Sequence, residues 1–375
     1  MKIKKNLSLY IHIPFCVQKC KYCDFLSFPS SGEDRNSYIQ ELKKEIIWKS
    51  KWASDYQVIS IFFGGGTPSL LNQDQMKELL ICIKEHYKVE PEAEITLEVN
   101  PGTLTKDKLR NYKKCGINRL SMGLQSTDDA ELRMLGRIHT FQEFKKNYQD
   151  ARAVGFDNIN IDLMSALPGQ TMESYKKTLE QIVKLRPEHI SAYSLIVEEG
   201  TPLAGDNDLL SRLPDEETDR RMYQYTKEYL KMYGYERYEI SNYAKLRKEC
   251  LHNCVYWTGG EYLGFGLGAS SYFEGERFHN ETDISRYRFD GEKQEIDHLS
   301  KEDQMEEFMF LGLRMTAGIK EVEFEKKFHQ NIHDVYGQVL KKQMEEGLII
   351  REKGRIYLTE RGLDVSNYVF CDYLL

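Results

Sequence analysis

The alternation of strand-like and helix-like segments between residue 7 and about residue 243 constrains the fold more than any other feature of the sequence. Short apolar runs rich in Ile, Val and Phe alternate with longer stretches in which Leu, Ile or Tyr recur at intervals of three and four residues. The expected strands are residues 7–13, 58–63, 95–99, 119–124, 159–164 and 189–197, and the expected helices are residues 36–52, 74–87, 105–115, 141–154 and 171–185. Repeated βα units of this kind predict a parallel sheet with crossover helices, either an open doubly wound sheet or a partial barrel.

The sequence changes character after residue 197. We expect a helix at residues 214–233, and the glycine-rich segment 259–268 requires tight turns or close backbone contacts. Further helices are expected at residues 302–316, 321–328 and 334–346, followed by two short strands, a succession that resembles a winged-helix domain. The α/β chain is therefore predicted to comprise a barrel-like domain at residues 1–243, a connecting segment at residues 244–300 and a helical, winged-helix-like domain at residues 301–375.

The charge balance and the cysteine content narrow the function. Lys and Arg number 52 and Asp and Glu number 59, giving a formal net charge of -7, which argues against a nucleic-acid partner. No apolar run is long enough for a transmembrane helix, and the basic start leads into a strand-like stretch rather than a signal peptide. We therefore expect a cytoplasmic protein, in which clustered cysteines indicate metal or redox chemistry rather than disulfides.

Cys16, Cys20 and Cys23 form a cluster directly after the first expected strand. Thiolates are soft ligands that suit zinc or an iron–sulfur cluster. A structural zinc site needs four protein ligands, and no second cysteine pair with suitable spacing follows nearby, although His12 is a candidate for a fourth ligand. Three thiolates on a four-iron cluster would leave one iron open for reaction. The spacing thus favours a [4Fe–4S] cluster, with zinc and three unrelated buried cysteines as the alternatives.

Glycines and polar residues recur at the ends of successive expected strands or in the loops that follow them. These residues are Gly65, Gly66, Thr67, Glu98, Gln125, Arg137 and Asp162. The glycines either form a plain turn or let a backbone approach a ligand closely, and each polar residue alone would be an ordinary surface residue. Together at one edge of a parallel sheet, they would point into a shared mouth. The acidic groups there suit hydroxyls or an ammonium group, and the arginine suits a carboxylate.

The cysteine spacing at the end of the first strand of a βα array resembles the radical S-adenosylmethionine (SAM) superfamily. The resemblance implies a partial (β/α)6 barrel in which the three cysteines hold a [4Fe–4S] cluster whose open iron is chelated by the methionine part of SAM. In that superfamily the reduced cluster cleaves SAM to a deoxyadenosyl radical. Tyr22 matches the aromatic residue beside adenine, and the glycine run matches the loop that holds the methionine amino group. The implied SAM ligands are therefore Tyr10, Tyr22 and the strand-end residues.

The order of the motifs is similar to the coproporphyrinogen-dehydrogenase-like branch of this superfamily over nearly the whole chain. The motifs are Tyr10-Ile-His-Ile-Pro-Phe-Cys16, Gly64-Gly-Gly-Thr-Pro68, Glu98-Val-Asn-Pro101, Gly123-Leu-Gln-Ser126 and Asp162-Leu-Met. The branch contains an oxygen-independent coproporphyrinogen III oxidase and heme chaperones that bind heme and deliver it to respiratory hemoproteins. The oxidase has a further cysteine where this chain has Phe25, and a longer N-terminal extension. Both differences favour a chaperone over an enzyme.

The segment His252-Asn-Cys-Val-Tyr256-Trp257 matches the His-Asn-x-x-Tyr-Trp signature of the heme chaperones. A neutral imidazole is a common axial ligand of heme iron, and the two aromatic residues offer flat apolar surfaces. His252 is therefore predicted to be an exposed or half-exposed heme ligand. The alternatives are a histidine that is hydrogen-bonded within a loop and a metal site formed with Cys250 and Cys254, whose close spacing gives a poor tetrahedron.

The resemblance implies three kinds of partner: heme, an acceptor hemoprotein that includes membrane-bound respiratory ones, and an electron donor. The resemblance is also compatible with a homodimer. Two functions compete with that of a heme chaperone. One is the radical SAM decarboxylation of coproporphyrinogen III, and the other is a winged-helix regulator that uses the cluster as a sensor, against which the net negative charge argues.

Overall fold

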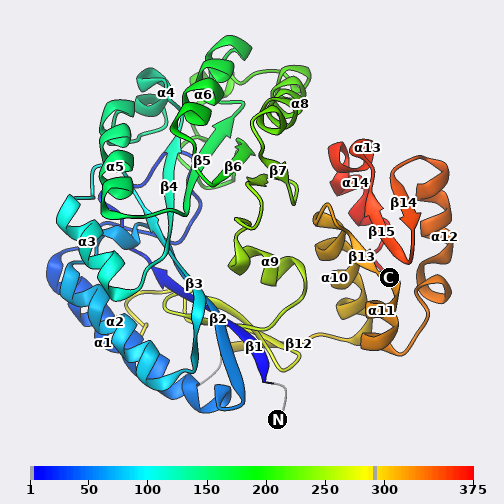
Figure 1. Cartoon of the computed structure of the whole chain (residues 1–375), viewed down its shortest axis with the longest axis horizontal. Coiled ribbons are helices and arrows are strands. Elements are labelled where there is room, and N and C mark those ends of the chain that lie inside the picture. The colour runs from blue at the N-terminus through cyan, green and yellow to red at the C-terminus, as the bar shows by residue number, and fades with distance from the viewer. Residues whose placement is uncertain (1–3, 290–293) are drawn as a thin grey trace.

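The computed structural model describes residues 4–289 and 294–375. Residues 1–3 and 290–293, which fall within the segments expected at 1–243 and 244–300, lie outside the described residues. One large hydrophobic core extends from Leu7 to Tyr287, and a second extends from Met305 to Tyr373. In Figure 1 the C-terminal domain, coloured orange to red, lies beside the domain that contains the large sheet.

The central strands lie side by side in sequence order and are all parallel. They are β1 (Lys5–Ile13), β2 (Tyr56–Gly65), β3 (Val89–Val99), β4 (Arg119–Gln125), β5 (Ile159–Ser165) and β6 (His189–Ser194). Sequential order with right-handed crossovers places every connecting helix on the same face of the sheet. This order excludes the doubly wound alternative and confirms the partial barrel. In Figure 1 the connecting helices follow one another around one side of the sheet.

The connecting helices begin where the sequence offers capping residues. They are α1 (Gly32–Lys49), α2 (Gln73–His86), α3 (Lys106–Cys115), α4 (Asp129–Met134), α5 (Phe141–Val154) and α6 (Met172–Leu185). Ser31, Asn72, Thr140 and Thr171 form capping boxes, which satisfy backbone N–H groups that have no partner within the helix. Helix α4 was not expected, because six residues are too few to show a helical periodicity.

Strand β1 shows how the sheet separates its two faces. Leu7, Leu9 and Ile11 are fully buried. Because side chains alternate along a strand, Tyr10 and His12 lie on the opposite face, which is the inner face of the partial barrel. The inner face therefore carries polar side chains that are available to a site.

The chain after β6 extends the sheet at both of its edges. The elements are α7 (Asn207–Leu210), α8 (Glu216–Met232), β7 (Glu236–Arg237), β8 (Asn242–Ala244), α9 (Leu251–Trp257), β9 (Tyr262–Phe265), β10 (Ser270–Phe273), β11 (Glu276–His279) and β12 (Gln294–His298). Strand β8 pairs with β6, whereas β9 returns to pair with β1 at the other edge. Among the described residues, these strands and the central ones form one sheet of 12 strands.

The glycine-rich segment contains β9 and is shaped by the chain itself. A Cβ on Gly264 would lie 2.2 Å from the backbone oxygen of Ser270, and one on Gly266 would lie 2.7 Å from that of His12. Gly266 also has a positive φ of 95°. These two glycines therefore allow neighbouring strands to approach.

The C-terminal domain has the expected helices and hairpin with additions. Its elements are α10 (Lys301–Arg314), β13 (Ile319–Lys320), α11 (Glu321–Phe328), α12 (Ile332–Glu345), β14 (Ile349–Glu352), β15 (Arg355–Leu358), α13 (Glu360–Asp364) and α14 (Ser366–Cys371). Strand β13 adds a third strand to the hairpin, and the two terminal helices were not expected. Of the helices within the described ranges, none is both long and apolar enough to cross a membrane.

Candidate functional site

A cavity of about 350 Å³, here named the cysteine pocket, lies between the cysteine loop and the carboxyl ends of the central strands. Most of the predicted site residues line it: Cys16, Cys20, Tyr22, Cys23, Gly65, Gly66, Thr67, Glu98, Gln125, Arg137 and Asp162. Tyr10 and His252 are not among its lining residues. The shared mouth expected from the strand ends is therefore present.

The three clustered cysteines are all free thiols and face this pocket. Cys16 is buried, with its Sγ 3.5 Å from Thr67 Oγ1, and Cys20 and Cys23 are half-buried. The Arg137 guanidinium donates from Nη1 to Cys20 Sγ at 3.5 Å. A set of three reduced thiols beside a cavity is the donor chemistry that an iron–sulfur cluster requires.

The alternative metal ligands are not arranged as ligands. Across residues 4–289 and 294–375, no three His, Cys, Asp or Glu side chains are placed to hold a single metal ion. Neither Cys250, His252 and Cys254 nor the three clustered cysteines are placed as ligands of one single ion. His12 is engaged at both ring nitrogens, by Tyr10 Oη at 3.1 Å and by the Leu26 carbonyl at 2.9 Å.

The glycine run beneath the cysteines packs against the chain itself. Gly65 has a φ of +109°, and a Cβ there would lie 2.5 Å from the His12 ring. Gly66 donates its N–H to the Ile13 carbonyl at 2.9 Å, and a Cβ there would lie 2.7 Å from the Phe15 carbonyl oxygen. The end of β2 therefore lies directly against the cysteine loop, which requires residues without a side chain.

Two half-buried carboxyl groups, Glu98 and Asp162, share the pocket. Burial raises the pKa of Glu98 to about 8, and the nearby Asp162 charge raises it further, whereas a hydrogen bond from the Gly65 N–H opposes the shift. Burial also raises the pKa of Asp162, against hydrogen bonds to its carboxylate that lower it. Neither carboxyl has an ion-pair partner within the part of the chain that the structure describes. A cationic ligand group would therefore be favoured here.

Arg137 is held at the mouth by neutral groups instead of a carboxylate. Its Nη2 donates to Asn100 Oδ1 and to the Gly123 carbonyl, while its Nε is buried without a partner among the described residues. A buried donor without an acceptor is costly, so a ligand that supplies an acceptor there would be stabilised. Gln125 has a positive φ of 77°, a backbone conformation that strains a non-glycine residue at a strand end.

The sequence argument missed Asn100 and Ser121, which line the pocket, and Asn160, which supports Asp162 from behind it. Asn100 connects Thr67 to Arg137, with its Nδ2 donating to Thr67 Oγ1 at 3.1 Å. Asn160 Nδ2 donates to Asp162 Oδ1 at 2.7 Å, and Ser121 Oγ donates to Asp162 Oδ2 at 3.2 Å. Asn100 and Asn160 lie two positions from an acidic residue already singled out. Asn160 and Asp162 share a face of β5 because side chains alternate along a strand, and Asn100 directly follows β3, so the spacing of two was the available signal.

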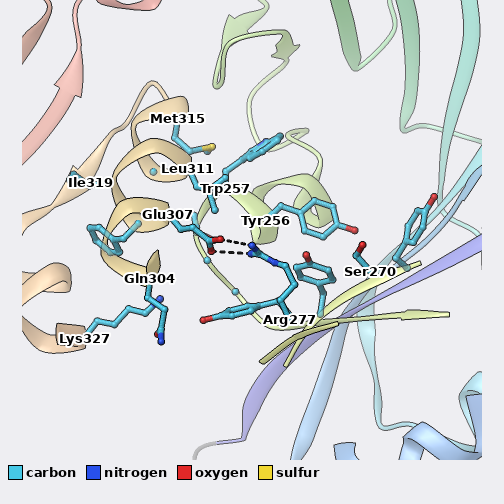
Figure 2. A pocket seen from close by; sticks show the side chains of 18 of the residues that line it. Tyr256, Trp257, Ser270, Arg277, Gln304, Glu307, Leu311, Met315, Ile319 and Lys327 are labelled. Carbon is cyan, nitrogen blue, oxygen red and sulfur yellow. Dashed lines mark hydrogen bonds and ion pairs between the residues drawn. The ribbon is translucent and has the colours of Figure 1, made fainter. Parts of the chain in front are cut away.

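A second cavity, of about 480 Å³, lies between the barrel domain and the C-terminal domain and is here named the interdomain cavity (Figure 2). Helix α9 and strands β9 to β11 line one side, and helices α10 and α11 line the other. Tyr10 lines this cavity rather than the cysteine pocket, and its role as a SAM ligand stays a prediction. A Cβ on Gly64 would lie 3.0 Å from the Tyr10 ring and 3.2 Å from Glu98 Oε2, which shows how close the two cavities are.

His252 does not have the expected exposure, because it is only 1% exposed. Its Nδ1 lies 2.9 Å from Ser60 Oγ and its Nε2 lies 2.7 Å from Tyr256 Oη. The cause is long-range: the Glu94 carboxylate accepts hydrogen bonds from the backbone N–H groups of Leu251 and His252 and holds the start of α9 over the barrel interior. Burial, with a smaller effect of a nearby guanidinium, lowers the pKa of His252 to about 3, so the ring is neutral.

Comparison with known proteins agrees with this architecture. Residues 10–182 match the radical SAM superfamily, and residues 299–365 match the HemN C-terminal domain. A solved structure of coproporphyrinogen III oxidase (HemN) from Escherichia coli superimposes with a TM-score of 0.88 at 23% identity, covering 99% of this chain and 90% of that one. The fold and the three-cysteine pocket thus define a radical SAM protein with a HemN-type C-terminal domain.

Two curated relatives identify the family within this class. The heme chaperone HemW of Lactococcus lactis is 36% identical over 100% of this chain and 98% of its own length. The heme chaperone HemW of Bacillus subtilis is also 36% identical, over 98% of this chain and 99% of its own length. The chain belongs to the HemW family. Its membership in the radical SAM superfamily implies a [4Fe–4S] cluster and SAM as cofactors, and the three free thiols and the unpartnered Arg137 Nε fit these groups.

Proposed function

We propose that this protein is a heme chaperone: it binds heme, a [4Fe–4S] cluster and SAM, and it delivers heme to acceptor hemoproteins. The observation that carries the proposal is its 36% identity to the Lactococcus lactis heme chaperone HemW over 100% of the chain. Because that similarity spans both domains, it includes the segment from His252 to Trp257 and both walls of the interdomain cavity.

Cys16, Cys20 and Cys23 would hold the cluster, which when bound supplies one-electron chemistry toward SAM. Glu98 and Asp162 offer acceptors to the ammonium and hydroxyl groups of SAM. Arg137, Gln125 and the glycine backbone surround the same space, with Tyr22 beside the adenine. A ligand with positive charge suits two carboxyl groups that form no direct ion pair among the described residues, although Arg119 lies near enough to lower the pKa of both. The role of each of these residues stays a prediction.

The partners and the place of action follow from the same proposal. We expect the acceptors to include respiratory hemoproteins, and we expect an electron donor to reduce the cluster. We also expect the protein to act in the cytoplasm, and a homodimer remains open. The division of the chain at residues 243 and 300 is likewise kept as a prediction.

The competing function is the oxidative decarboxylation of coproporphyrinogen III, the reaction of the oxidase HemN, on whose structure this chain superimposes. That likeness, at 23% identity, shows the fold alone. Phe25 lines the cysteine pocket and is 60% exposed, at the position where a further cysteine is expected in the oxidase. An exposed phenylalanine cannot replace a thiol as a ligand or a proton donor.

Two measurements on the reconstituted full-length protein test the proposal. Incubation with coproporphyrinogen III, SAM and a reductant should yield no protoporphyrinogen. Mixing the heme-loaded protein with a purified heme-free respiratory hemoprotein should restore the heme spectrum of that acceptor faster than free heme does. Protoporphyrinogen formation together with no heme transfer would establish the oxidase instead.

A further inference from the structure

We propose that heme occupies the interdomain cavity and that the hydroxyl of Tyr256, rather than the imidazole of His252, ligates its iron. His252 then acts as a positioning residue that holds the hydrogen of that hydroxyl. This proposal rests on the proposed function and assigns it a site.

The interdomain cavity has the size and the walls that a flat apolar ligand requires. Its volume of about 480 Å³ lies in the range of ligand pockets, which are of order 300–1,000 Å³. Aromatic side chains line it from both domains, namely Trp257, Tyr272 and Phe308. Gly259, Gly260, Gly268, Gly312 and Gly318 also line it, and glycines leave a wall open to a large planar ring. Figure 2 shows these walls facing each other across the cavity.

Tyr256 lines this cavity, whereas His252 lies behind it. The two side chains lie on the same face of α9, four residues apart, and their rings meet edge to face with centroids 5.0 Å apart. In Figure 2 the Tyr256 side chain extends across the cavity, away from α10 and toward the side on which Ser270 lies. The hydroxyl, and not the imidazole, is therefore the potential iron ligand that a molecule in the cavity would meet.

The hydrogen bonds behind Tyr256 determine which atom donates. Ser60 Oγ donates to Ser8 Oγ at 2.6 Å, so its own proton is not available to His252. The Nδ1–H of His252 consequently donates to Ser60 Oγ at 2.9 Å, which leaves Nε2 as the acceptor of the Tyr256 O–H at 2.7 Å. Tyr256 is thus a phenol whose hydrogen is already held by a base.

Binding of ferric heme would use this pair in one balanced step. The O–H bond of Tyr256 breaks, its proton is released to water because the buried imidazole of His252 stays neutral, and the phenolate oxygen forms a bond to the iron. No electron is transferred, and His252 carries no charge before or after the step. Tyrosinate is an established axial ligand of heme iron. His12, whose imidazole does line the cavity, is engaged at both nitrogens.

The cavity also carries groups for the two carboxylates of heme. Lys327 lines it and has no ion pair within the described ranges; its Nζ lies 3.7 Å from the position of a Cβ on Gly259, on the opposite wall. Arg277 of β11 forms a two-pronged ion pair with Glu307 of α10, drawn in Figure 2, which a carboxylate ligand could replace. Trp257 Nε1 is a buried donor without a partner among the described residues.

The test compares Tyr256→Phe with Tyr262→Phe, which removes another hydroxyl from the same cavity. Each full-length protein is titrated with ferric heme, and resonance Raman spectroscopy is used to detect iron–phenolate vibrations. The wild type and Tyr262→Phe should show these vibrations. Tyr256→Phe should lose them and bind ferric heme at least about tenfold more weakly, while keeping its iron–sulfur absorbance. His252→Gln, whose carboxamide oxygen can still accept the Tyr256 hydrogen, should keep them, whereas His252→Leu, which removes the acceptor, should weaken them.

Each contrary outcome identifies what is wrong. Iron–phenolate vibrations that persist in Tyr256→Phe, or that are absent from a heme-bound wild type, would overturn the site and leave the heme chaperone function standing. A wild type that binds no heme would overturn both. If Tyr256→Phe does not fold, the wild-type spectrum alone decides, because the absence of iron–phenolate vibrations contradicts the assignment.

Discussion

The cysteine pocket and the interdomain cavity are neighbours built in different ways. The cysteine pocket takes its residues from one loop and from the ends of successive parallel strands, and its walls carry thiols, carboxyl groups and a guanidinium. The interdomain cavity takes its residues from α9, β9 to β11, α10 and α11, and its walls are mostly aromatic side chains and glycines. The first suits a small charged cofactor and the second a large flat ligand. The chain can therefore hold both without one site displacing the other.

The largest expected effect is the loss of iron on substitution of a cysteine in the cysteine pocket. Cys20→Ala should reduce the iron of anaerobically reconstituted protein from about four atoms per chain to nearly none, because a four-iron cluster cannot be kept on two thiolates. Cys371→Ala, which removes an exposed free cysteine of the C-terminal domain, should keep the full iron content. The iron content and the visible absorbance of the cluster are measured in both proteins. Full iron retention in single variants of all three clustered cysteines would contradict the cluster assignment.

The contrast between the cavities also explains what could be predicted from the sequence. Glu98, Gln125 and Asp162 were located correctly because a βα repeat brings the ends of its strands to one edge. Tyr10, whose role as a SAM ligand stays a prediction, lies earlier in β1, on the inner face but before the strand end, and it faces the other cavity. A local repeat predicts which edge a residue reaches but not how deep it lies.

The predicted exposure of His252 is wrong, because its burial has a long-range cause. Its burial depends on Glu94, which is 158 positions away and holds the start of α9 over the barrel interior. No pattern near His252 contains that information. The interdomain cavity as a whole has the same property, since it exists only where segments distant in sequence pack together. The return of β9 to the β1 edge was unpredictable for this reason too.

The second prediction tests whether the floor of the cysteine pocket is rigid. Gly66→Ala should lower the free energy of unfolding by about 3 kcal/mol, because the added Cβ would lie 2.7 Å from the Phe15 carbonyl oxygen, which is held in the backbone. Gly337→Ala, within α12, meets nothing within 4 Å and should instead stabilise by about 0.5–1 kcal/mol. Chemical denaturation measures both. Equal stability of Gly66→Ala and the wild type would show that the backbone near Gly66 and Phe15 moves to accommodate the added Cβ.

The third prediction tests the independence of the two cavities. Glu98→Ala and Asp162→Ala should each weaken SAM binding by about 1–3 kcal/mol, the usual effect of losing one hydrogen-bond partner in a buried site. Iron content and heme affinity should stay at wild-type values, because neither residue lines the interdomain cavity. Calorimetric titration with SAM and optical titration with heme check the two expectations. Unchanged SAM affinity in both variants would show that the strand-end assignment is wrong.

A smaller effect follows from the protonation of Glu98. Its pKa is about 8 in the folded protein against 4.5 as the reference, so between these values the folded state keeps a proton that the unfolded state has lost. Stability without SAM should therefore fall as pH rises through this window, and Glu98→Gln, which cannot ionise, should remove that part of the slope. Asp162 is present in both proteins, so its own contribution largely cancels. One full proton corresponds to a slope of roughly 1.4 kcal/mol per pH unit in the free energy of unfolding. If the wild type and Glu98→Gln show the same slope from pH 5 to pH 8, the raised pKa is contradicted.

The smallest expected effect concerns the contact between the two walls of the interdomain cavity. Arg277 and Glu307 join β11 to α10, but their side chains are 35% and 18% exposed, so water already screens part of the attraction. Arg277→Met should therefore lower the free energy of unfolding by only about 1 kcal/mol or less. It should weaken heme binding more clearly than it weakens folding, since it removes a cation suited to a propionate, while SAM affinity stays unchanged. Glu307→Gln is the informative companion, because it removes the same ion pair but leaves the guanidinium free for a ligand. If Arg277 serves only to join the domains, the two variants should bind heme equally. If Arg277 also serves the ligand, Glu307→Gln should bind heme at least as tightly as the wild type and Arg277→Met should bind it more weakly.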